Sequence, residues 1–197
     1  MKTEIEVKFL NADPDVLRTK LQSIGAIMEQ PMRQMRRQVF YLVDRSKDAY
    51  LRVRDEGDKV TMTYKQFDGN NGLHSAQEVE VAVSRFDDAI TIVQEAGLEP
   101  KSYQETRRET WKIGTTEIVI DEWPWLKPFI EIEGDSEADV REVAAKLGYD
   151  WDAEAVFGPV TQAYRAAYDM PEGFIADKLP EIRFDAPLPS IFTPKSS

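Results

Sequence analysis

The chain has 197 residues, no cysteine, a single histidine and a formal net charge of −11. This length suits one domain, and 42% apolar residues are enough to form a core. The missing cysteines exclude disulfides, thiolate metal sites and thiol nucleophiles, so any metal site must use oxygen ligands. The negative charge argues against general nucleic-acid binding. Because no run of about eighteen apolar residues occurs, we expect no membrane span, no signal peptide and a cytoplasmic location.

The first predicted strand, residues 4–10, is charged on one face. Side chains alternate along a strand, so Glu4, Glu6 and Lys8 share one face and apolar side chains share the other. An ordinary half-buried strand turns its polar face to water, because buried carboxylates are costly unless they are paired or bound to metal. The alternative is that the charged face points inward.

The Glu-x-Glu spacing returns twice, at Glu78/Glu80 and at Glu131/Glu133, each time in an apolar, β-branched run typical of strands. Each of the three strands is followed by a helical pattern that stops at a glycine. The predicted caps and stops are Asp13 and Gly25, Ser84 and Gly97, and Ser136 and Gly148. These weak internal repeats favour one sheet-based domain built from similar strand-then-helix pieces.

Basic residues gather between the first two copies. The arginines of residues 33–38 indicate either an RNA-binding face or a solvated rim, and we keep only Arg37 as a phosphate contact. The strand at 50–54 places Arg52 and Arg54 on one face, and a turn at 55–58 predicts a hairpin with 59–65. Residues 66–77 are typical of a mobile loop, in which His74 is expected to be a surface residue.

The second half predicts another hairpin, formed by 107–113 and 117–121. Trp123 and Trp125 follow it, and they are expected either to stack on a nucleobase or, as we prefer, to pack at the domain edge. A short helix is expected at 159–168. The proline-rich extension at 169–197 is expected to drape over the body or to be partly disordered, which leaves residues 1–168 as the main domain.

The predicted fold class is α+β, with eight antiparallel strands closed into a barrel and helices packed outside. If the apolar strand faces, such as Val79/Val81, meet the helices, the charged faces line the interior. The eight strands are 4–10, 38–43, 50–54, 59–65, 78–83, 107–113, 117–121 and 129–133.

The interior of such a barrel holds acids and bases together. Clustered carboxylates suit Mg²⁺ or Mn²⁺, and a matching set of lysines and arginines suits a polyphosphate chain. The acids are Glu4, Glu6, Glu78, Glu80, Asp121, Glu131 and Glu133, and the bases are Lys8, Arg52, Arg54, Lys65 and one of Arg107 or Arg108.

The ordered set of motifs resembles the CYTH superfamily, the class IV adenylyl cyclase and thiamine triphosphatase group also called triphosphate tunnel metalloenzymes. The resemblance covers about residues 1–168. It rests on Glu4-x-Glu6-x-Lys8, Leu51-Arg52-x-Arg54, Thr63-Tyr64-Lys65, Glu78-x-Glu80, the basic strand at 107–108, Asp121 and Glu131-x-Glu133, in that order.

This resemblance implies a barrel open as a charged tunnel, with divalent metal on its acidic side and a triphosphate on its basic side. It implies metal ligands at Glu4, Glu6, Glu131 and Glu133, catalytic roles for Lys8 and Asp121, and phosphate contacts from Lys8, Arg52, Arg54, Lys65, Arg107 and Arg108. Members of the family hydrolyse tripolyphosphate, nucleoside triphosphates or thiamine triphosphate, or they cyclise ATP.

Two departures from the family pattern stand out. Thr106 replaces a lysine common in the basic strand, and Lys127-Pro128 replaces a glycine before the last strand. We expect metal-dependent hydrolysis of a small-molecule triphosphate, in preference to cyclisation of ATP to cyclic AMP and pyrophosphate. A non-catalytic nucleotide or polyphosphate sensor and a structural adaptor stay open as alternatives, and so does the choice between monomer and homodimer.

Overall fold

A computed structural model describes residues 2–3, 5–67, 76–171 and 179–195 of the chain, with the side chains of residues 2 and 3 left aside. Glu4 and His74 lie outside the described residues, as does most of the predicted loop at 66–77. The expectations for these residues are therefore untested.

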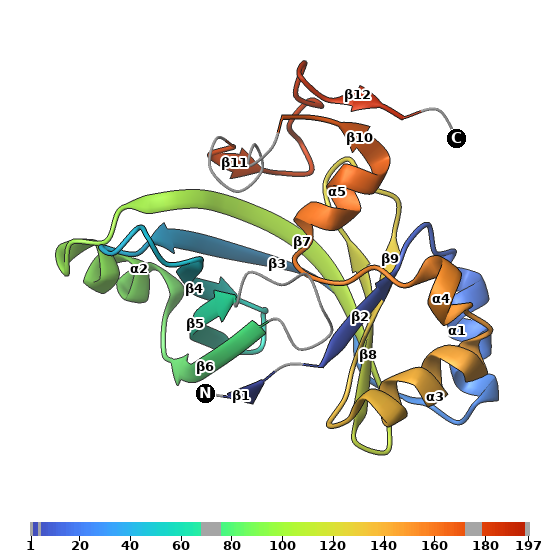
Figure 1. Ribbon diagram of the computed structural model, residues 1–197. Coiled ribbons are helices and arrows are strands. Elements are labelled where there is room, and N and C mark those ends of the chain that lie inside the picture. Colours follow the sequence, from blue (N-terminus) through green and yellow to red (C-terminus); the bar gives the residue numbers. More distant parts are fainter. Residues whose placement is uncertain (1, 4, 68–75, 172–178, 196–197) are drawn as a thin grey trace.

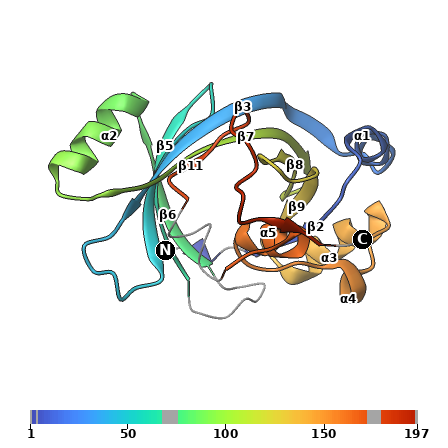
Figure 2. The same cartoon turned by 90° about the horizontal axis from the view of Figure 1, so that it is seen from above.

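The body is a curled antiparallel sheet that forms a half-barrel, with helices packed on its outer side and one short helix, residues 161–167, beside its concave side (Figures 1 and 2). Neighbouring strands follow the order β1-β6-β5-β4-β3-β7-β8-β9-β2. Their bounds are β1 Lys2–Thr3, β2 Glu6–Phe9, β3 Ile27–Tyr41, β4 Ala49–Asp55, β5 Val60–Phe67, β6 Ala76–Val83, β7 Pro100–Ile113, β8 Thr116–Glu122 and β9 Phe129–Glu133. The predicted barrel-like α+β architecture is confirmed.

Residues 2–3 and residues 6–9 pair with strands at opposite edges of the sheet. The backbone of β1 pairs with β6 at one edge, and β2 pairs with β9 at the other, with Lys8 opposite Glu131 and Glu6 opposite Glu133. One short segment thus pairs with strands from both ends of the sheet, which reduces the number of unpaired strand edges.

Two strands are longer than the sequence predicted. β3 begins at Ile27, well before 38, and β7 begins at Pro100, before 107. The early part of β3 contains Pro31, which lacks a backbone N–H, and the β3–β7 register shifts between Gln30 and Arg33. A proline within a polar run argues against a strand when only the sequence is considered. In the structure, the shift in the β3–β7 register accommodates Pro31.

The helices are α1 Pro14–Ser23, α2 Phe86–Glu95, α3 Glu137–Leu147, α4 Trp151–Glu154 and α5 Thr161–Ala167. The side chains of Asp13 and Ser136 accept hydrogen bonds from the first turns of α1 and α3, as predicted. The expectation for Ser84 was wrong: Arg85 is the N-cap of α2 and makes no capping side-chain bond. The short helix α4 was not predicted.

Most of the apolar core lies outside the sheet, as the inward-facing charges require. One cluster packs α1 and α3 against β2, β7, β8 and β9, with Val7, Ile130 and Ile132 fully buried. A second packs α2 against β3 and β4 around Phe40. The prediction that Val79/Val81 meet helices was wrong, because these side chains are about half exposed, at 51% and 50%.

The C-terminal part packs on the barrel. Its two-residue strand β11 (Glu181–Ile182) pairs in parallel with β7 at Tyr103 and Gln104. The strands β10 (Tyr168–Asp169) and β12 (Thr193–Pro194) pair with each other. Buried Phe192 joins a third apolar cluster with Trp123 and Tyr164. No helix among the described residues is long and apolar enough to cross a membrane.

One buried carboxylate fixes α1 to the outer surface of the barrel. Glu109 on β7 accepts hydrogen bonds from Arg18 of α1, at 2.9 to 3.2 Å, and from the indole N–H of Trp111 at 2.7 Å. Its side chain is 3% exposed. Losing it leaves buried donors without an acceptor.

We therefore expect Glu109→Ala to lower the free energy of unfolding by about 3 kcal/mol, measured by urea denaturation. The matched control is Glu142→Ala, which removes a carboxylate from the exposed Glu142–Lys146 pair and should cost less than about 1 kcal/mol. Equal losses in the two variants would contradict the structural role given to Glu109.

Candidate functional site

The concave side of the sheet encloses a cavity of about 540 Å³. Among the described residues, nine lysines and arginines and eight carboxylates line it. The chain as a whole carries a net charge of −11, so the bases are concentrated here. Every described interior residue expected from the sequence lines the cavity, apart from Arg107: Glu6, Lys8, Arg37, Arg52, Arg54, Lys65, Glu78, Glu80, Arg108, Asp121, Glu131 and Glu133.

One wall of the cavity is basic. Arg52 and Arg54 project from β4, and Arg37 lies directly opposite Arg54 on β3. All three are well buried, with Arg37 at 7% and Arg52 at 8% exposed. The Nε atom of each is buried and has no hydrogen-bond partner in the protein. Because buried donors without an acceptor are costly, this wall is suited to an anion.

The pKa values on this wall show the mutual repulsion of its cations. Burial, followed by the charges of Arg52, Arg54 and Arg108, holds the pKa of Arg37 well below its ordinary value. Burial and Arg52 also lower the pKa of Arg54, to about 10. An anion bound among these groups relieves both the repulsion and the desolvation of the cations.

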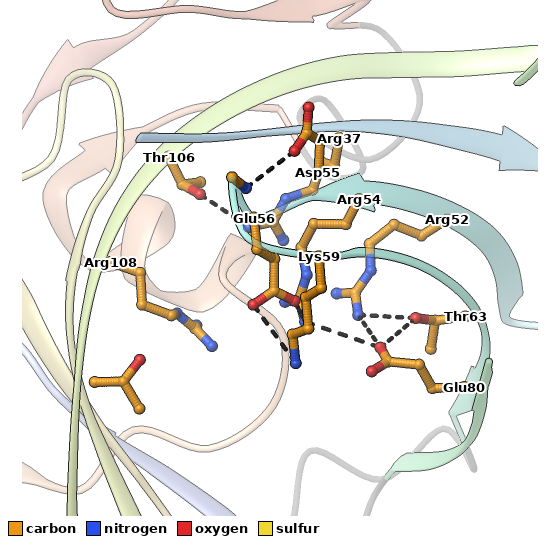
Figure 3. A network of polar contacts seen from close by, with 12 residues as sticks. Arg37, Arg52, Arg54, Asp55, Glu56, Lys59, Thr63, Glu80, Thr106 and Arg108 are labelled. Atoms are coloured by element: carbon orange, nitrogen blue, oxygen red, sulfur yellow. Dashed lines mark hydrogen bonds and ion pairs between the residues drawn. The ribbon is translucent and has the colours of Figure 1, made fainter. Parts of the chain in front are cut away.

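Glu80 offsets part of this charge. Its carboxylate lies 3.6 Å from Arg52 and 3.8 Å from Arg54, and it accepts a hydrogen bond of 2.7 Å from the hydroxyl of Thr63. Arg52 in turn donates to Thr63 at 3.2 Å. Glu80 therefore acts on the basic wall, where it orients Arg52 (Figure 3).

Arg37 reaches across to Thr106 on the neighbouring strand β7. Thr106 is 1% exposed and accepts a hydrogen bond of 3.1 Å from Arg37 (Figure 3). The guanidinium also stacks on the ring of Trp123 at 4.8 Å. A cation from β3 thus reaches the inward-facing side of β7.

The opposite wall holds the carboxylates of β2 and β9. The ammonium of Lys8 lies between two of them, 2.9 Å from Glu6 and 3.2 Å from Glu131, and it also donates to the carbonyl of Gly158 at 2.9 Å. All three donors of Lys8 are therefore used within the protein. Lys8 is part of the acidic wall and ties it to the C-terminal segment.

Charge coupling dominates the pKa values on this wall. Burial alone lowers the pKa of Lys8, but Glu131 and Glu6 raise it above its ordinary value. Burial raises the pKa of Glu131, but Lys8, Arg108 and Lys65 together lower it to about 2. Both groups remain charged near neutral pH.

Arg108 and Asp121 join the two walls. The Arg108 guanidinium donates two hydrogen bonds to the Asp121 carboxylate, at 2.7 and 2.6 Å, and lies 3.6 Å from Glu131. This bidentate geometry fixes the orientation of Arg108. The neighbouring Arg107 faces away from the cavity, where it pairs with Glu122 at 3.3 Å and stacks on Phe184. Of the two arginines considered for the interior, only Arg108 lines the cavity.

Several cavity residues were not predicted. Glu117 lies opposite Glu133, which itself lies opposite Glu6, so three carboxylates occupy one row across the sheet. Alternation with Asp121 along the strand is the signal that indicates it. Trp123 lines the cavity and has a buried indole N–H without a partner, whereas Trp125 packs against Phe192 as expected. Helix α5 contributes Gln162 and Arg165, which no sequence pattern placed here.

The carboxylates of the acidic wall are oxygen ligands of the kind that a divalent cation binds. No group of three or more His, Cys, Asp or Glu side chains within the described part of the chain converges tightly enough to hold one. Two carboxylates, Glu6 and Glu131, do converge on a single cationic atom, the Nζ of Lys8, and Glu133 lies beside Glu6 in the register. Oxygen ligands in this number fit Mg²⁺, which is commonly bound by one or two carboxylates together with substrate phosphates.

The depressed pKa of Glu131 gives a prediction about acid stability. An unfolded glutamate titrates near 4.3, so between roughly pH 4.3 and pH 2 the unfolded state binds more protons and the folded state loses stability as the pH falls. Glu131→Gln removes this contribution. The stability difference between wild type and variant, from urea unfolding, should shrink by roughly 2–3 kcal/mol from pH 5 to pH 2.5. A difference that stays constant over this range would rule out the coupling.

Several solved structures share the fold of this chain. No curated protein matches the chain. A candidate adenylate cyclase from Vibrio parahaemolyticus superposes with a TM-score of 0.68 at 13% identity, covering 83% of this chain and 98% of that one. A conserved hypothetical protein from Pyrococcus furiosus gives 0.65 at 19% identity, covering 77% and 94%. A candidate adenylyl cyclase from Hippeastrum, described as having a dominant triphosphatase activity, gives 0.52 at 13% identity, covering 79% and 90%.

At these identities the structures show a shared fold. The family assignment comes from the sequence match, which extends over most of the barrel and includes both of its charged walls. The CYTH domain family matches residues 2–152, and the chain belongs to this family.

Proposed function

We propose that the protein catalyses the divalent-metal-dependent hydrolysis of a triphosphate: inorganic tripolyphosphate, a nucleoside triphosphate or thiamine triphosphate. The observation that carries this proposal is the pair of facing walls in one cavity. The buried Nε atoms of Arg37, Arg52 and Arg54 lack acceptors, and carboxylates line the same cavity. A polyanion and a divalent cation together satisfy both walls.

The basic wall binds and orients the substrate. Arg37, Arg52, Arg54 and Lys65 offer charged donors to the phosphate oxygens, and Glu80 with Thr63 holds Arg52 in position. Arg108 is held by Asp121 so that it faces both the acidic wall and the basic wall. In this proposal Asp121 is a positioning residue for Arg108.

The acidic wall supplies the metal ligands. Glu6, Glu131 and Glu133 would hold Mg²⁺ or Mn²⁺, with Glu4 as a further expected ligand outside the described residues. When bound, such a metal supplies charge neutralisation for the phosphate oxygens and lowers the pKa of water. Lys8 already compensates two of these carboxylates, so it keeps the site assembled before the ligands arrive.

One observation favours a second candidate function, adenylyl cyclisation of ATP to cyclic AMP and pyrophosphate. Cyclisation needs contacts that orient the nucleoside. Trp123 lines the cavity with an unpartnered indole N–H, so this side chain offers a donor beside the ring that Arg37 stacks on. We prefer hydrolysis because it requires only that water be placed beside the terminal phosphate.

Product analysis distinguishes the two reactions. The protein is incubated with ATP, and separately with tripolyphosphate, at saturating Mg²⁺ or Mn²⁺, and the products are separated by chromatography. Phosphate should be released from both substrates. Cyclic AMP as the main product from ATP, formed faster than phosphate from tripolyphosphate, would reverse the assignment, and binding without any turnover would indicate a sensor.

Metal and triphosphate should stabilise the fold together. Each ligand offsets repulsion on its own wall and makes binding of the other more favourable. At about one hundred times the dissociation constant, the pair should add roughly 2.7 kcal/mol, which raises Tm by roughly 5–10 °C for a chain of this size. Thermal scans with either ligand alone should give a much smaller rise. Identical Tm values with and without millimolar amounts of the pair would contradict the proposed site.

Neutralising one acidic-wall carboxylate should abolish turnover without unfolding the protein. Glu133→Gln keeps the size of the side chain but removes a charge from the expected metal site, and we expect at least a hundredfold lower kcat, equivalent to about 2.7 kcal/mol. Glu6→Gln should be equally inactive. Glu122→Gln is the matched control, because Glu122 pairs with Arg107 away from the cavity. Wild-type turnover in Glu133→Gln, with circular dichroism showing a folded protein, would remove this residue from the site.

A further inference from the structure

A buried carboxylate stands at the end of the basic wall. Glu56, in the turn between β4 and β5, is 4% exposed. Its oxygens lie 2.6 Å from Arg54, 3.4 Å from Arg33 and 3.8 Å from Lys59. Figure 3 shows the carboxylate among the side chains of Arg54 and Lys59, with the Arg108 guanidinium turned toward it. Of these three cations, Arg54 and Lys59 line the cavity, and all three are paired with this one anion.

The position of Glu56 continues the series of side chains that form the wall. Arg52 and Arg54 lie two positions apart on β4. Glu56 follows two positions later, just after the end of the strand at Asp55. Since a strand rises about 3.3 Å per residue, each step moves roughly 7 Å along the wall. A phosphate chain bound along Arg52 and Arg54 therefore meets a negative charge at the next step.

The turn holds this carboxylate in place. The Glu56 N–H donates to the carbonyl of Lys59 at 2.9 Å, and the Asp55 carboxylate accepts from the N–H of Gly57 at 3.0 Å. Gly57 has a φ of 92°, a left-handed conformation that favours glycine. The main chain on either side of Glu56 is thus fixed by local bonds.

Glu56 is also held in its charged form. Burial raises the pKa of its carboxyl, but Arg54, Lys59, Arg108 and Arg33 together lower it below the ordinary value. The interior thus contains a permanent negative charge surrounded by the cation types that bind phosphate.

We propose that Glu56 is a built-in anion that takes the place of a further phosphate at the end of the basic wall and thereby limits the length of the phosphate chain that the cavity binds. This inference rests on the proposed function. With Glu56 present, Arg33, Arg54 and Lys59 are already compensated, so a longer chain gains no additional partners there. Without its charge, these three cations become available to one more phosphate group.

A purely structural role for Glu56 predicts a different result. If the carboxylate only oriented Arg54, its loss would weaken the binding of short and long phosphate chains alike. The ratio of the Kd values for a short and a long phosphate chain, measured on the same variant, separates these possibilities. A general loss of order weakens the binding of both chains and leaves this ratio unchanged.

The test is calorimetric titration of tripolyphosphate and of linear tetrapolyphosphate into wild type, Glu56→Gln and the control Glu99→Gln, at the same Mg²⁺ concentration. The control also removes one negative charge, here from the exposed Glu99–Arg45 pair. We expect the two ligands to bind wild type and Glu99→Gln with similar Kd values. In Glu56→Gln the ratio of the tripolyphosphate Kd to the tetrapolyphosphate Kd should rise at least tenfold.

An unchanged ratio in Glu56→Gln would overturn the inference while leaving the proposed function intact. Wild type alone also provides a test, which does not depend on the folding of the variant: a tenfold preference of the wild-type protein for tetrapolyphosphate would overturn the inference as well. If wild type binds neither polyphosphate, the proposed function fails, and this inference fails with it.

Discussion

The structure depends on one constraint, which is that the strands of the barrel turn their charged faces inward. Neither wall is stable in isolation, because buried like charges repel and lose their hydration. The protein balances them in pairs that cross between strands, such as Lys8 with Glu6 and Glu131, and Arg108 with Asp121. Since these charges line much of the interior, two of the three apolar clusters form on the outer surface of the sheet, where α1, α2 and α3 cover it.

The balance is incomplete on the basic wall, and this is what suits the cavity to a ligand. Arg37 keeps a lowered pKa despite its stacking on Trp123 and its bond to Thr106. Internal partners are thus sufficient to fold the barrel but not to satisfy its cations. In an acidic chain, a concentrated set of bases also gives the ligand a defined location, because the remaining surface repels anions.

Much of the site could be predicted from strand alternation. The spacings at Glu6/Lys8, Arg52/Arg54 and Glu131/Glu133 place these side chains on one face each, and the curl of the sheet brings the faces together. What could not be predicted depends on pairing between distant segments. Local sequence contains no signal that Arg37 would meet Thr106, or that Gly158 would accept from Lys8, because these contacts join residues 69 and 150 positions apart.

Other differences between the predicted and the observed structure have local causes, which strand alternation does not include. Pro31 concealed the first half of β3, and the exposed outer face of β6 shows that an apolar strand face need not be covered by a helix. Glu56 extends the alternation of β4 into a turn, where polar residues are ordinarily assumed to face water.

On the proposed function, the inside of the barrel, rather than its outer surface, binds the triphosphate. Arg52 is buried on the basic wall, whereas Arg107 lies on the outer side of β7, and replacing either with methionine removes one guanidinium from the chain. In calorimetric titrations with tripolyphosphate and Mg²⁺, Arg52→Met should weaken binding at least tenfold, or about 1.4 kcal/mol, and Arg107→Met should leave Kd within about twofold of wild type. Equal losses in the two variants, or no loss in Arg52→Met, would contradict the account.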